Sequence, residues 1–509
     1  MTVTAAGTFD PWPVMMWANS NHLTVAAGKE KGTFAVTVGF DAAPGVYWLR
    51  ANNADGASPL RPFIVGTLPE VAEVEPNDEP AKSQVLETSA VVVNGRLAKN
   101  GDVDCFAVPL KKGQTLVAAL DAHDTLRSPM DGVLQLLSAD GFVLDQNNDF
   151  HGLDPQLAFT APKDGTYIAR VFAFPAAPGT SIRFGGGDAY VYRLTLTTGG
   201  FADHARPLAV ARTDPQNVEV VGWSIPDSAR KLAVLLPAAG TDFARVSAGG
   251  VANSVRVRVE PHPVLDATAP AFAQRPTPLA PPFSVSGRLG TAGKVDDYRF
   301  AGKKGQVLAL QVQSRAFGLP LSPVVQVLDA AGKQIARAEP ATLGGDTAVS
   351  FTPPADGAYT ARVADLYAAG GPRFAYLLRV TPAEPDYDLT AAADRFTVPP
   401  GKSLDVPVKV VRRNGFAKPV EIIAEGLPAG VTFATNPPAG KADPNTVTVT
   451  LTAGKVSASA PFRLVGRVKD APDLNRTARA ALADFDDTTA DLWVTVGDSS
   501  MAEVPKKKK

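Results

Sequence analysis

The chain has 509 residues, 45% of them hydrophobic, and its 50 Lys and Arg residues nearly balance its 51 Asp and Glu residues. A formal net charge of −1 without a basic stripe argues against nucleic acid as a partner. The single cysteine, Cys105, leaves no intramolecular disulfide and no cysteine-based metal cage. No window reaches the roughly 18 consecutive apolar residues of a transmembrane segment.

Length and turn content together predict several all-β domains. A chain this long is expected to hold about three to five domains. Its 44 Gly and 44 Pro residues separate short runs rich in Val, Thr, Tyr and Phe, which favour strands. We therefore expect tandem antiparallel β-sandwiches rather than alternating strands and helices.

The first segment, residues 1–70, is predicted to be an immunoglobulin-like sandwich. It contains the alternating run Pro44–Asn53, which ends in a turn rich in Asn, Asp and Gly. A full immunoglobulin-like domain needs about 100 residues, and Met1–Asp10 carry no Lys or Arg of a signal peptide. We therefore expect a truncated start, and a secreted, periplasmic or cell-surface protein in preference to a cytoplasmic one.

Two long segments are copies of one module. Asn94–Leu97 recurs as Ser286–Leu289, 192 residues later, and Pro162–Val171 recurs at the same offset as Pro354–Val363. In the first copy an Asp-Gly turn is followed by a run in which Tyr167, Ala169 and Val171 face one side and Ile168 and Arg170 face the other. This alternation is typical of one strand of a sandwich. The copies are predicted to be β-sandwiches over residues 71–200 and 271–382.

The remaining segments also read as β structure. Residues 201–270, with strand-like runs at Val218–Trp223 and Ser254–Val259, are predicted to form a small immunoglobulin-like β domain. Residues 383–498 are predicted to form a further immunoglobulin-like sandwich. A disordered basic tail is expected over residues 499–509, which end in Lys506–Lys509.

Several motifs of the first copy resemble one bacterial family. They are Glu73-Val74-Glu75-Pro76-Asn77-Asp78, Gly95, Asp102–Phe106, Asp164–Tyr167 and Tyr192–Leu194. Residues 71–198 resemble the bacterial pre-peptidase C-terminal domain, which includes the collagen-binding domains of clostridial collagenases, and residues 276–381 resemble it more weakly. The resemblance implies a non-catalytic, jelly-roll-like module of exported proteins, and the whole domain string resembles large exported planctomycete-type proteins.

A calcium site is predicted in the first copy. Calcium needs six to eight oxygen ligands, and carboxylates two residues apart on an extended strand share one face. In the collagen-binding relatives a calcium site is completed by the segment before the sandwich and by the start of the strand that corresponds to the run after Asp102. The predicted ligands are Glu73, Glu75, Asn77, Asp78, Asp102 and Asp104, with a solvated acidic linker as the alternative.

The second copy is an internal control for this site. Its counterpart of the acidic segment is Gln274-Arg275-Pro276-Thr277-Pro278, and Lys294 replaces Asp102, although Asp296 stands at the place of Asp104. We expect no cation site there. A second acidic group of the first copy, Asp145-Gln146-Asn147-Asn148-Asp149 with Asp154, is interpreted as a polar turn, with a second cation site as the alternative.

Surface tyrosines are the candidate ligand-binding residues. Tyrosines on one sheet face bind the ligand in the collagen-binding relatives, and Tyr167, Tyr190 and Tyr192 lie in the corresponding strands. Core packing is the alternative, because Tyr359 and Tyr376 of the second copy match Tyr167 and Tyr192.

The sequence offers no catalytic constellation. It has no Gly-x-Ser-x-Gly elbow, Gly497-Asp498-Ser499 stands where no helix follows, and its five histidines are scattered. The Gly185–Asp188 run is predicted to be a hairpin rather than a phosphate loop.

We expect a non-catalytic exported protein that is structural, adhesive or substrate-binding, with an extracellular protein or polysaccharide as partner. The alternative is an accessory C-terminal region of an exported peptidase or other hydrolase.

Overall fold

The computed structural model describes residues 1–497 except 178, 180–182, 238–241, 275–277, 343, 437–442 and 486. The predicted basic tail, Asp498 and Ser499, and Arg275–Thr277 lie outside the described residues. Strands dominate, and the described helical elements are α1 (His123–Leu126) and a few short 3-10 turns, so the all-β fold class is confirmed. Among the described residues, no helix has the length and apolar character needed to cross a membrane.

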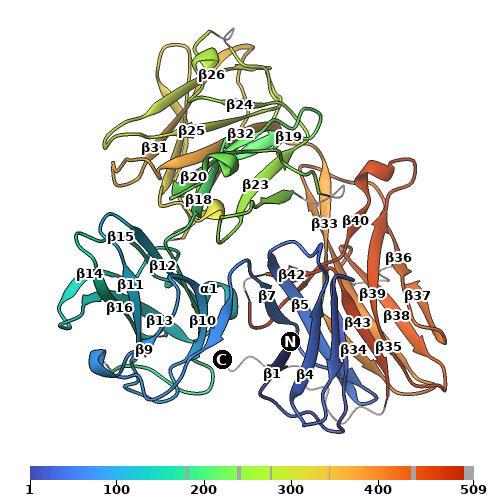
Figure 1. The fold of residues 1–509 in the computed structure, drawn as a ribbon. Helices are drawn as coiled ribbons and strands as arrows, with labels where there is room; N and C mark the ends of the chain where they lie inside the picture. The colour runs from blue at the N-terminus through green and yellow to red at the C-terminus, as the bar shows by residue number, and fades with distance from the viewer. Residues whose placement is uncertain are drawn as a thin grey trace. The chain divides into compact units, whose positions relative to one another are not determined.

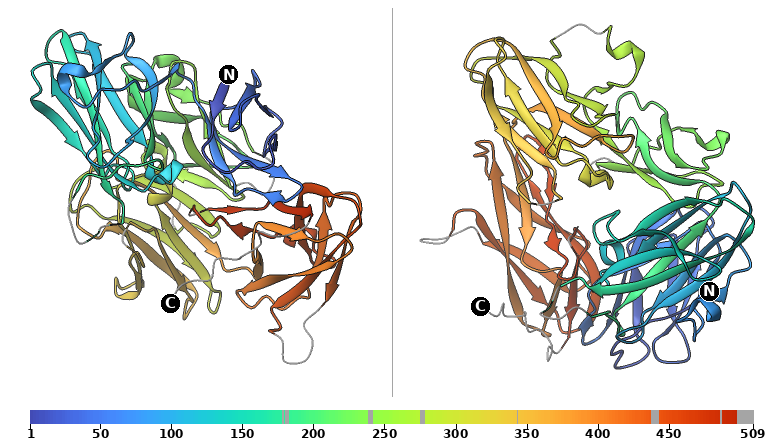
Figure 2. Two further views of the ribbon diagram at one scale, coloured as in Figure 1. Left: turned by 90° about the horizontal axis from the view of Figure 1, so that it is seen from below. Right: turned by 90° about the vertical axis from the view of Figure 1, so that its left-hand side faces the viewer.

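The chain divides into two compact units. One is formed by residues 66–383, and the other combines residues 1–65 with residues 384–509. Figure 1 labels the strands of both units, and the two further views in Figure 2 show sheets that no long helix covers.

The first repeat consists of two five-stranded sheets, ordered β15-β12-β17-β10-β8 and β14-β13-β16-β11-β9. Side chains of alternating residues meet between the sheets, among them Phe106, Leu134, Tyr167 and Leu194. The strands are β8 (Glu70–Ala72), β9 (Gln84–Val85), β10 (Ala90–Arg96), β11 (Asp104–Leu110), β12 (Thr115–Asp121), β13 (Met130–Ser138), β14 (Val143–Asn147), β15 (Gln156–Thr160), β16 (Gly165–Pro175) and β17 (Val191–Thr197).

The second repeat has the same strand order, except that an isolated bridge between Leu279 and Phe300 stands in the place of β9. Its sheets run β30-β27-β32-β25-β24 and β29-β28-β31-β26. Even the register shift between Leu136 and Leu137 recurs, between Val327 and Leu328. The strands are β24 (Val264–Asp266), β25 (Phe283–Arg288), β26 (Asp296–Gly302), β27 (Leu308–Gln313), β28 (Pro323–Leu328), β29 (Gln334–Ala338), β30 (Thr347–Phe351), β31 (Gly357–Asp365) and β32 (Ala375–Pro382).

Between the repeats lies a smaller pair of sheets, ordered β18-β20-β21 and β19-β23-β22. These sheets have a core of their own, built mainly from Val and Ala side chains. The strands are β18 (Phe201–Arg206), β19 (Ala209–Ala211), β20 (Val218–Trp223), β21 (Lys231–Leu232), β22 (Phe243–Val246) and β23 (Val255–Glu260).

The other unit combines two pairs of main sheets. Residues 1–65 form sheets β1-β4-β3 and β2-β5-β6, with β7 also on β5. Residues 384–497 form sheets β33-β35-β38-β37 and β34-β43-β39-β36, with β40 on β39 and a separate β41-β42 pair. The strands are β1 (Thr2–Thr4), β2 (Met15–Ala18), β3 (Leu23–Ala27), β4 (Thr33–Val38), β5 (Gly45–Asn53), β6 (Gly56–Ala57), β7 (Arg61–Val65), β33 (Asp386–Ala391), β34 (Arg395–Val398), β35 (Ser403–Arg413), β36 (Glu421–Glu425), β37 (Val431–Asn436), β38 (Thr446–Ala453), β39 (Ala458–Arg467), β40 (Arg476–Thr477), β41 (Ala480–Ala481), β42 (Thr488–Thr489) and β43 (Leu492–Val496).

Candidate metal centre

The acidic segment of the first repeat crosses from one sheet to the other. It follows β8, which pairs with β10, and precedes β9, which pairs with β11. Backbone hydrogen bonds hold it at both ends: Glu73 N donates to Asn94 O at 3.0 Å, and Cys105 N donates to Asn77 O at 3.1 Å. The crossing therefore places the segment beside the start of β11, where Asp102 and Asp104 lie.

Three carboxylates converge at this point. Glu75, Asp102 and Asp104 each offer an oxygen, and these oxygens lie within 4.8 Å of one another. Asp102 is 1% exposed and Asp104 is fully buried, whereas Glu75 is at the surface. Among the described residues, these three carboxylates are the one group of Asp, Glu, His or Cys side chains close enough together to hold a metal ion.

Asn77 adds a fourth polar side chain, and it is fully buried. One end of its amide lies 3.2 Å from Oε2 of Glu75 and 3.1 Å from Oδ1 of Asp104. With nitrogen at that end, the amide donates to both carboxylates. With oxygen at that end, it becomes a further oxygen ligand that faces the same point as the carboxylates.

Asp102 has a buried oxygen with no hydrogen-bond partner. Its Oδ2 accepts a short hydrogen bond from Ala98 N, but its Oδ1 is unsatisfied. Lys99 Nζ lies 3.9 Å from Oδ1, and that ammonium group is on an exposed side chain. An orphaned carboxylate oxygen aimed at other carboxylates is costly in a metal-free fold, and it fits a cation ligand.

Asp104 and Glu73 share the hydroxyl group of Tyr192. The hydroxyl oxygen lies 2.5 Å from Oδ2 of Asp104 and 3.1 Å from Oε2 of Glu73. One hydroxyl hydrogen serves only one carboxylate at a time. Burial, with the negative charges of Glu73 and Asp102 nearby, raises the pKa of Asp104 to about 8, and burial also raises the pKa of Glu73. Glu73 is therefore linked to Asp104 through the hydroxyl group of Tyr192.

Gly95 makes this arrangement possible. A Cβ at this position would lie 2.2 Å from Cζ of Tyr192 and 2.5 Å from Oε2 of Glu73. Gly287 is its counterpart in the second repeat, where a Cβ would lie 2.4 Å from the hydroxyl oxygen of Tyr376. Only glycine admits the tyrosine ring beside the strand in both repeats.

Two supporting elements were not predicted as part of the site. The side chain of Gln84 accepts a hydrogen bond from Val74 N at 2.8 Å and donates one to Ala72 O at 3.1 Å, so it fixes the acidic segment. Gly186 abuts the loop before Asp102, because a Cβ there would lie 1.9 Å from Lys99 O. The recurring glycine in both repeats, at Gly186 and Gly370, was the available sequence signal for this close approach.

Asp78 and Asp154 do not belong to this group of three converging carboxylates. Asp78 is partly exposed, and its Oδ1 lies 4.0 Å from Lys99 Nζ. Asp154 accepts backbone hydrogen bonds from Ala122, His123 and Asp124 at 2.7–3.2 Å, and so it caps the first turn of α1. Its oxygens are therefore occupied by backbone donors, as in a polar turn.

In the second repeat a lysine side chain takes the place of one carboxylate of the cluster. Lys294 Nζ lies 3.0 Å from Oδ1 of Asp296, which is the first residue of β26. Tyr376 donates a hydrogen bond to Oδ2 of Asp296 at 2.7 Å. The hydroxyl oxygen of Tyr298 lies 2.6 Å from that of Tyr376, where the first repeat uses Glu73. An ammonium group and a phenol thus replace two carboxylates.

The three predicted ligand-binding tyrosines are largely core residues. Tyr167 and Tyr192 are 3% and 1% exposed and belong to the core between the sheets. Tyr167 donates a hydrogen bond to Lys163 O at 3.0 Å. Tyr190 is partly buried and packs against the same core. Of the three, Tyr190 is therefore the one whose ring a ligand could reach without displacing the core.

One group of described residues superficially resembles a catalytic triad. Nε2 of His262 lies 2.8 Å from Oγ of Ser284 and 3.5 Å from Oε2 of Glu260. A triad needs the acid on the other ring nitrogen and an accessible nucleophile. Ser284 is fully buried, and Glu260 also pairs with Arg258 and Arg379. This group therefore has the geometry of a buried ion network.

Two solved structures show distant similarity to the chain. The M60 catalytic domain with the CBM51-1 and CBM51-2 domains from Clostridium perfringens ZmpB matches at 10% identity and a TM-score of 0.15, over 74% of this chain and 56% of that one. Escherichia coli alpha-2-macroglobulin activated by porcine elastase matches at 11% identity and a TM-score of 0.14, over 93% and 48%. The chain thus spans about half the length of these structures, and such TM-scores establish no shared fold.

Comparison by sequence identifies the first repeat. No curated protein matches the chain. A family model does match, over the residues from Asp102 of the acidic cluster to Ala173 in β16. The predicted resemblance is therefore confirmed: the chain contains a bacterial pre-peptidase C-terminal domain, matched over residues 102–173.

Proposed function

We propose that this chain is a non-catalytic, exported bacterial protein whose first repeat binds one calcium ion. The observation that carries the proposal is the unsatisfied, buried Oδ1 of Asp102, which lies among the carboxylates of Glu75 and Asp104. A divalent cation would satisfy all three carboxylates and the Asn77 oxygen at once.

The chemistry of the ligands favours calcium over transition metals. Carboxylate and amide oxygens are hard ligands, and the cluster contains neither histidine nor cysteine among its described members. Calcium also accepts irregular geometry and solvent ligands, which suits an exposed Glu75 beside buried Asp102 and Asp104. Because bound calcium requires ionised carboxylates, its binding would release the protons that the metal-free cluster retains.

The role in the exported protein would be to present or bind an extracellular protein or polysaccharide. Support comes from the pre-peptidase C-terminal domain itself, which is found in secreted bacterial proteins. Binding to collagen, to polysaccharides and to cell-wall material, measured with calcium and with chelator, tests this role. Uniformly negative results would contradict it.

A second candidate is an accessory region of an exported peptidase or other hydrolase. The family match favours it, since the family is described by its position beside a peptidase. The coding DNA upstream of Met1 distinguishes the two candidates. An in-frame catalytic domain supports the accessory role, and an immediate stop codon argues against it.

Calcium should raise the melting temperature of the purified chain, because a ligand that binds only the folded state stabilises it by mass action. Free calcium at about 100 times its Kd adds about 2.7 kcal/mol, which corresponds to roughly 5–10 °C. Asp104→Ala should abolish the increment, as measured by calorimetry against a chelator baseline.

Asp296→Ala is the matched control, because Asp296 occupies the same place in the second repeat beside Lys294. That variant should lower stability without changing the calcium increment. An increment that survives Asp104→Ala would place the calcium elsewhere and overturn the assignment.

A further inference from the structure

Residues 1–65 have too small a core to account for a stable domain. Their buried apolar side chains are only Val14, Leu23, Phe34, Val36 and Leu60. None of these five residues belongs to a larger buried hydrophobic cluster, because the clusters of the described chain contain no residue before Leu86. Domains of about 60 residues are only marginally stable, and the small core of residues 1–65 indicates that they need a further surface against which to pack.

That surface is the outer face of β43 and its neighbours. Leu492, Val494 and Val496 point into the core of the sandwich formed by residues 384–497. Trp493 and Thr495 point the other way, as alternation requires, yet they are only 2% and 1% exposed. Outer-face side chains are this deeply buried only when another element covers them.

The covering side chains come from residues 1–65. The ring of Trp17 meets the ring of Trp493 edge to face, with centroids 5.8 Å apart. The guanidinium of Arg50 lies 5.6 Å from the centre of the Trp493 ring. A second aromatic contact joins Trp48 to Phe485 at 5.0 Å. The interface thus has the aromatic and arginine anchors typical of binding hot spots.

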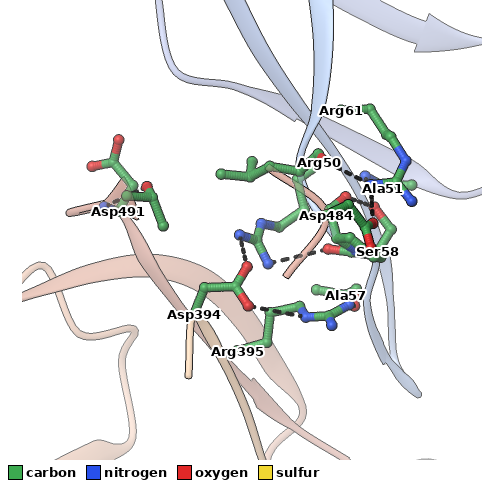
Figure 3. A network of polar contacts seen from close by, with 12 residues as sticks. Arg50, Ala51, Ala57, Ser58, Arg61, Asp394, Arg395, Asp484 and Asp491 are labelled. Carbon is green, nitrogen blue, oxygen red and sulfur yellow. Dashed lines mark hydrogen bonds and ion pairs between the residues drawn. The ribbon is translucent and has the colours of Figure 1, made fainter. Parts of the chain in front are cut away.

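A buried ion pair lies at the centre of this interface (Figure 3). The Arg50 side chain is fully buried, and its Nη2 lies 2.7 Å from Oδ2 of Asp394, which is 14% exposed. Arg50 Nη1 donates to Ser58 O at 3.1 Å, and Arg395 Nη1 donates to Ala57 O at 3.2 Å. These contacts orient residues 1–65 on the C-terminal sandwich and make the fit specific.

We propose that this face of the C-terminal sandwich is a docking site that also accepts residues 1–65 of a second copy of the chain. The interface contains no covalent link, and its two halves are separated in the sequence by the compact unit of residues 66–383. Exchange between two copies recreates every contact of the closed chain, as in domain swapping. The balance between the closed chain and the exchanged pair then depends on protein concentration and on the effective concentration set by the intervening unit.

Complementary charge variants of the full chain test the proposal. Arg50→Asp places two carboxylates together within its own chain, and Asp394→Arg places two guanidinium groups together. Each variant weakens its own interface, although Arg395 also pairs with Asp394 at 3.4 Å. A mixed pair can form two matched interfaces: the introduced carboxylate at position 50 meets the introduced guanidinium at position 394, and the native pair forms at the other interface. The double variant Arg50→Asp with Asp394→Arg restores a matched pair within one chain and is the control.

Light scattering after size-exclusion chromatography gives the readout. Each single variant alone, and the double variant, should have the mass of one chain, 53.1 kDa. An equimolar mixture of the single variants should give a species of twice that mass. Should a single variant be insoluble alone, the two are co-produced with different tags, and copurification is expected for the unlike pair but for neither variant with itself. A mixture that stays at the mass of one chain, or unlike copies that do not copurify, would overturn the proposal.

Discussion

At the scale of single residues, the two repeats differ in the side chains that surround one aspartate at the start of a strand. Asp104 and Asp296 stand at equivalent places, and each accepts a hydrogen bond from a buried tyrosine. Lys294 supplies the positive charge that Asp296 needs. In the first repeat the position of Lys294 is occupied by Asp102. A second buried carboxylate therefore adds to the negative charge of Asp104, where a lysine would neutralise it. This difference is the reason to expect calcium in the first repeat alone.

The raised pKa of Asp104 predicts an unusual pH dependence of the metal-free protein. The folded pKa is about 8 and the ordinary value is 3.8, so between these values the folded state holds a proton that the unfolded state has released. The contribution of Asp104 to stability is therefore present at low pH and is lost as the pH rises from about 4 to about 8. Calorimetry of the wild type and of Asp104→Asn in chelator should show this loss in the wild type only. Parallel curves for the two proteins would contradict the assignment.

Gly95→Ala should disturb the site by steric conflict. Its Cβ would meet the ring of Tyr192 and the carboxylate of Glu73, and overpacking of this kind costs about 1–3 kcal/mol. Because Tyr192 holds Asp104, the variant should also weaken calcium binding measured by titration calorimetry. Gly287→Ala creates the same conflict with Tyr376, so it should cost similar stability and leave the calcium affinity unchanged.

At the scale of secondary-structure elements, the site is built from connections between strands. The crossing from β8 to β9 brings Glu75 and Asn77 to the loop before β11, which carries Asp102. Gly187, between β16 and β17, also contacts that loop, since its N donates to Leu97 O at 2.8 Å. The cluster therefore depends on three loops whose positions the two sheets determine.

Gly186→Ala should reveal this dependence. A side chain at Gly186 would collide with Lys99 O and push away the loop that positions Asp102. Calcium affinity should fall at least tenfold in a titration, with a smaller loss of stability in chelator. Gly290→Ala is the control, because a Cβ at Gly290 has no neighbour within 4 Å. Unchanged affinity in Gly186→Ala would show that the loop has no part in binding.

At the scale of the whole molecule, the two compact units should unfold separately. The proposed calcium ligands all lie within residues 66–383, whereas the Arg50–Asp394 pair belongs to the other unit. Calorimetry should therefore show two transitions, of which calcium raises one. Arg50→Ala should lower the free energy of unfolding of the other unit by about 2 kcal/mol, because it removes the hydrogen bonds of a buried guanidinium group to Ser58 and Asp394. A single transition, or one in which both changes act together, would contradict this division.

The all-β class and the resemblance of the first repeat could be predicted because both depend on local pattern. Alternation of apolar residues decides which side of a strand is buried, and Asp-Gly turns mark where strands end. The duplication could be read from recurring residues such as Gly95 and Gly287. Spacing also indicated that Glu75 and Asn77, like Asp102 and Asp104, share faces. Whether they bind calcium stays a prediction.

The rest was decided by contacts between residues far apart in the sequence. Tyr192 joins Asp104 to Glu73 across 88 and 119 residues, and Arg50 meets Asp394 across 344 residues. No periodicity links such positions, since only the packing of complete sheets brings them together. Sequence therefore determined which side chains each strand offers to each face. The tertiary structure decided which of the buried charges found partners, because burial and pairing are properties of the assembled surfaces and not of any one segment.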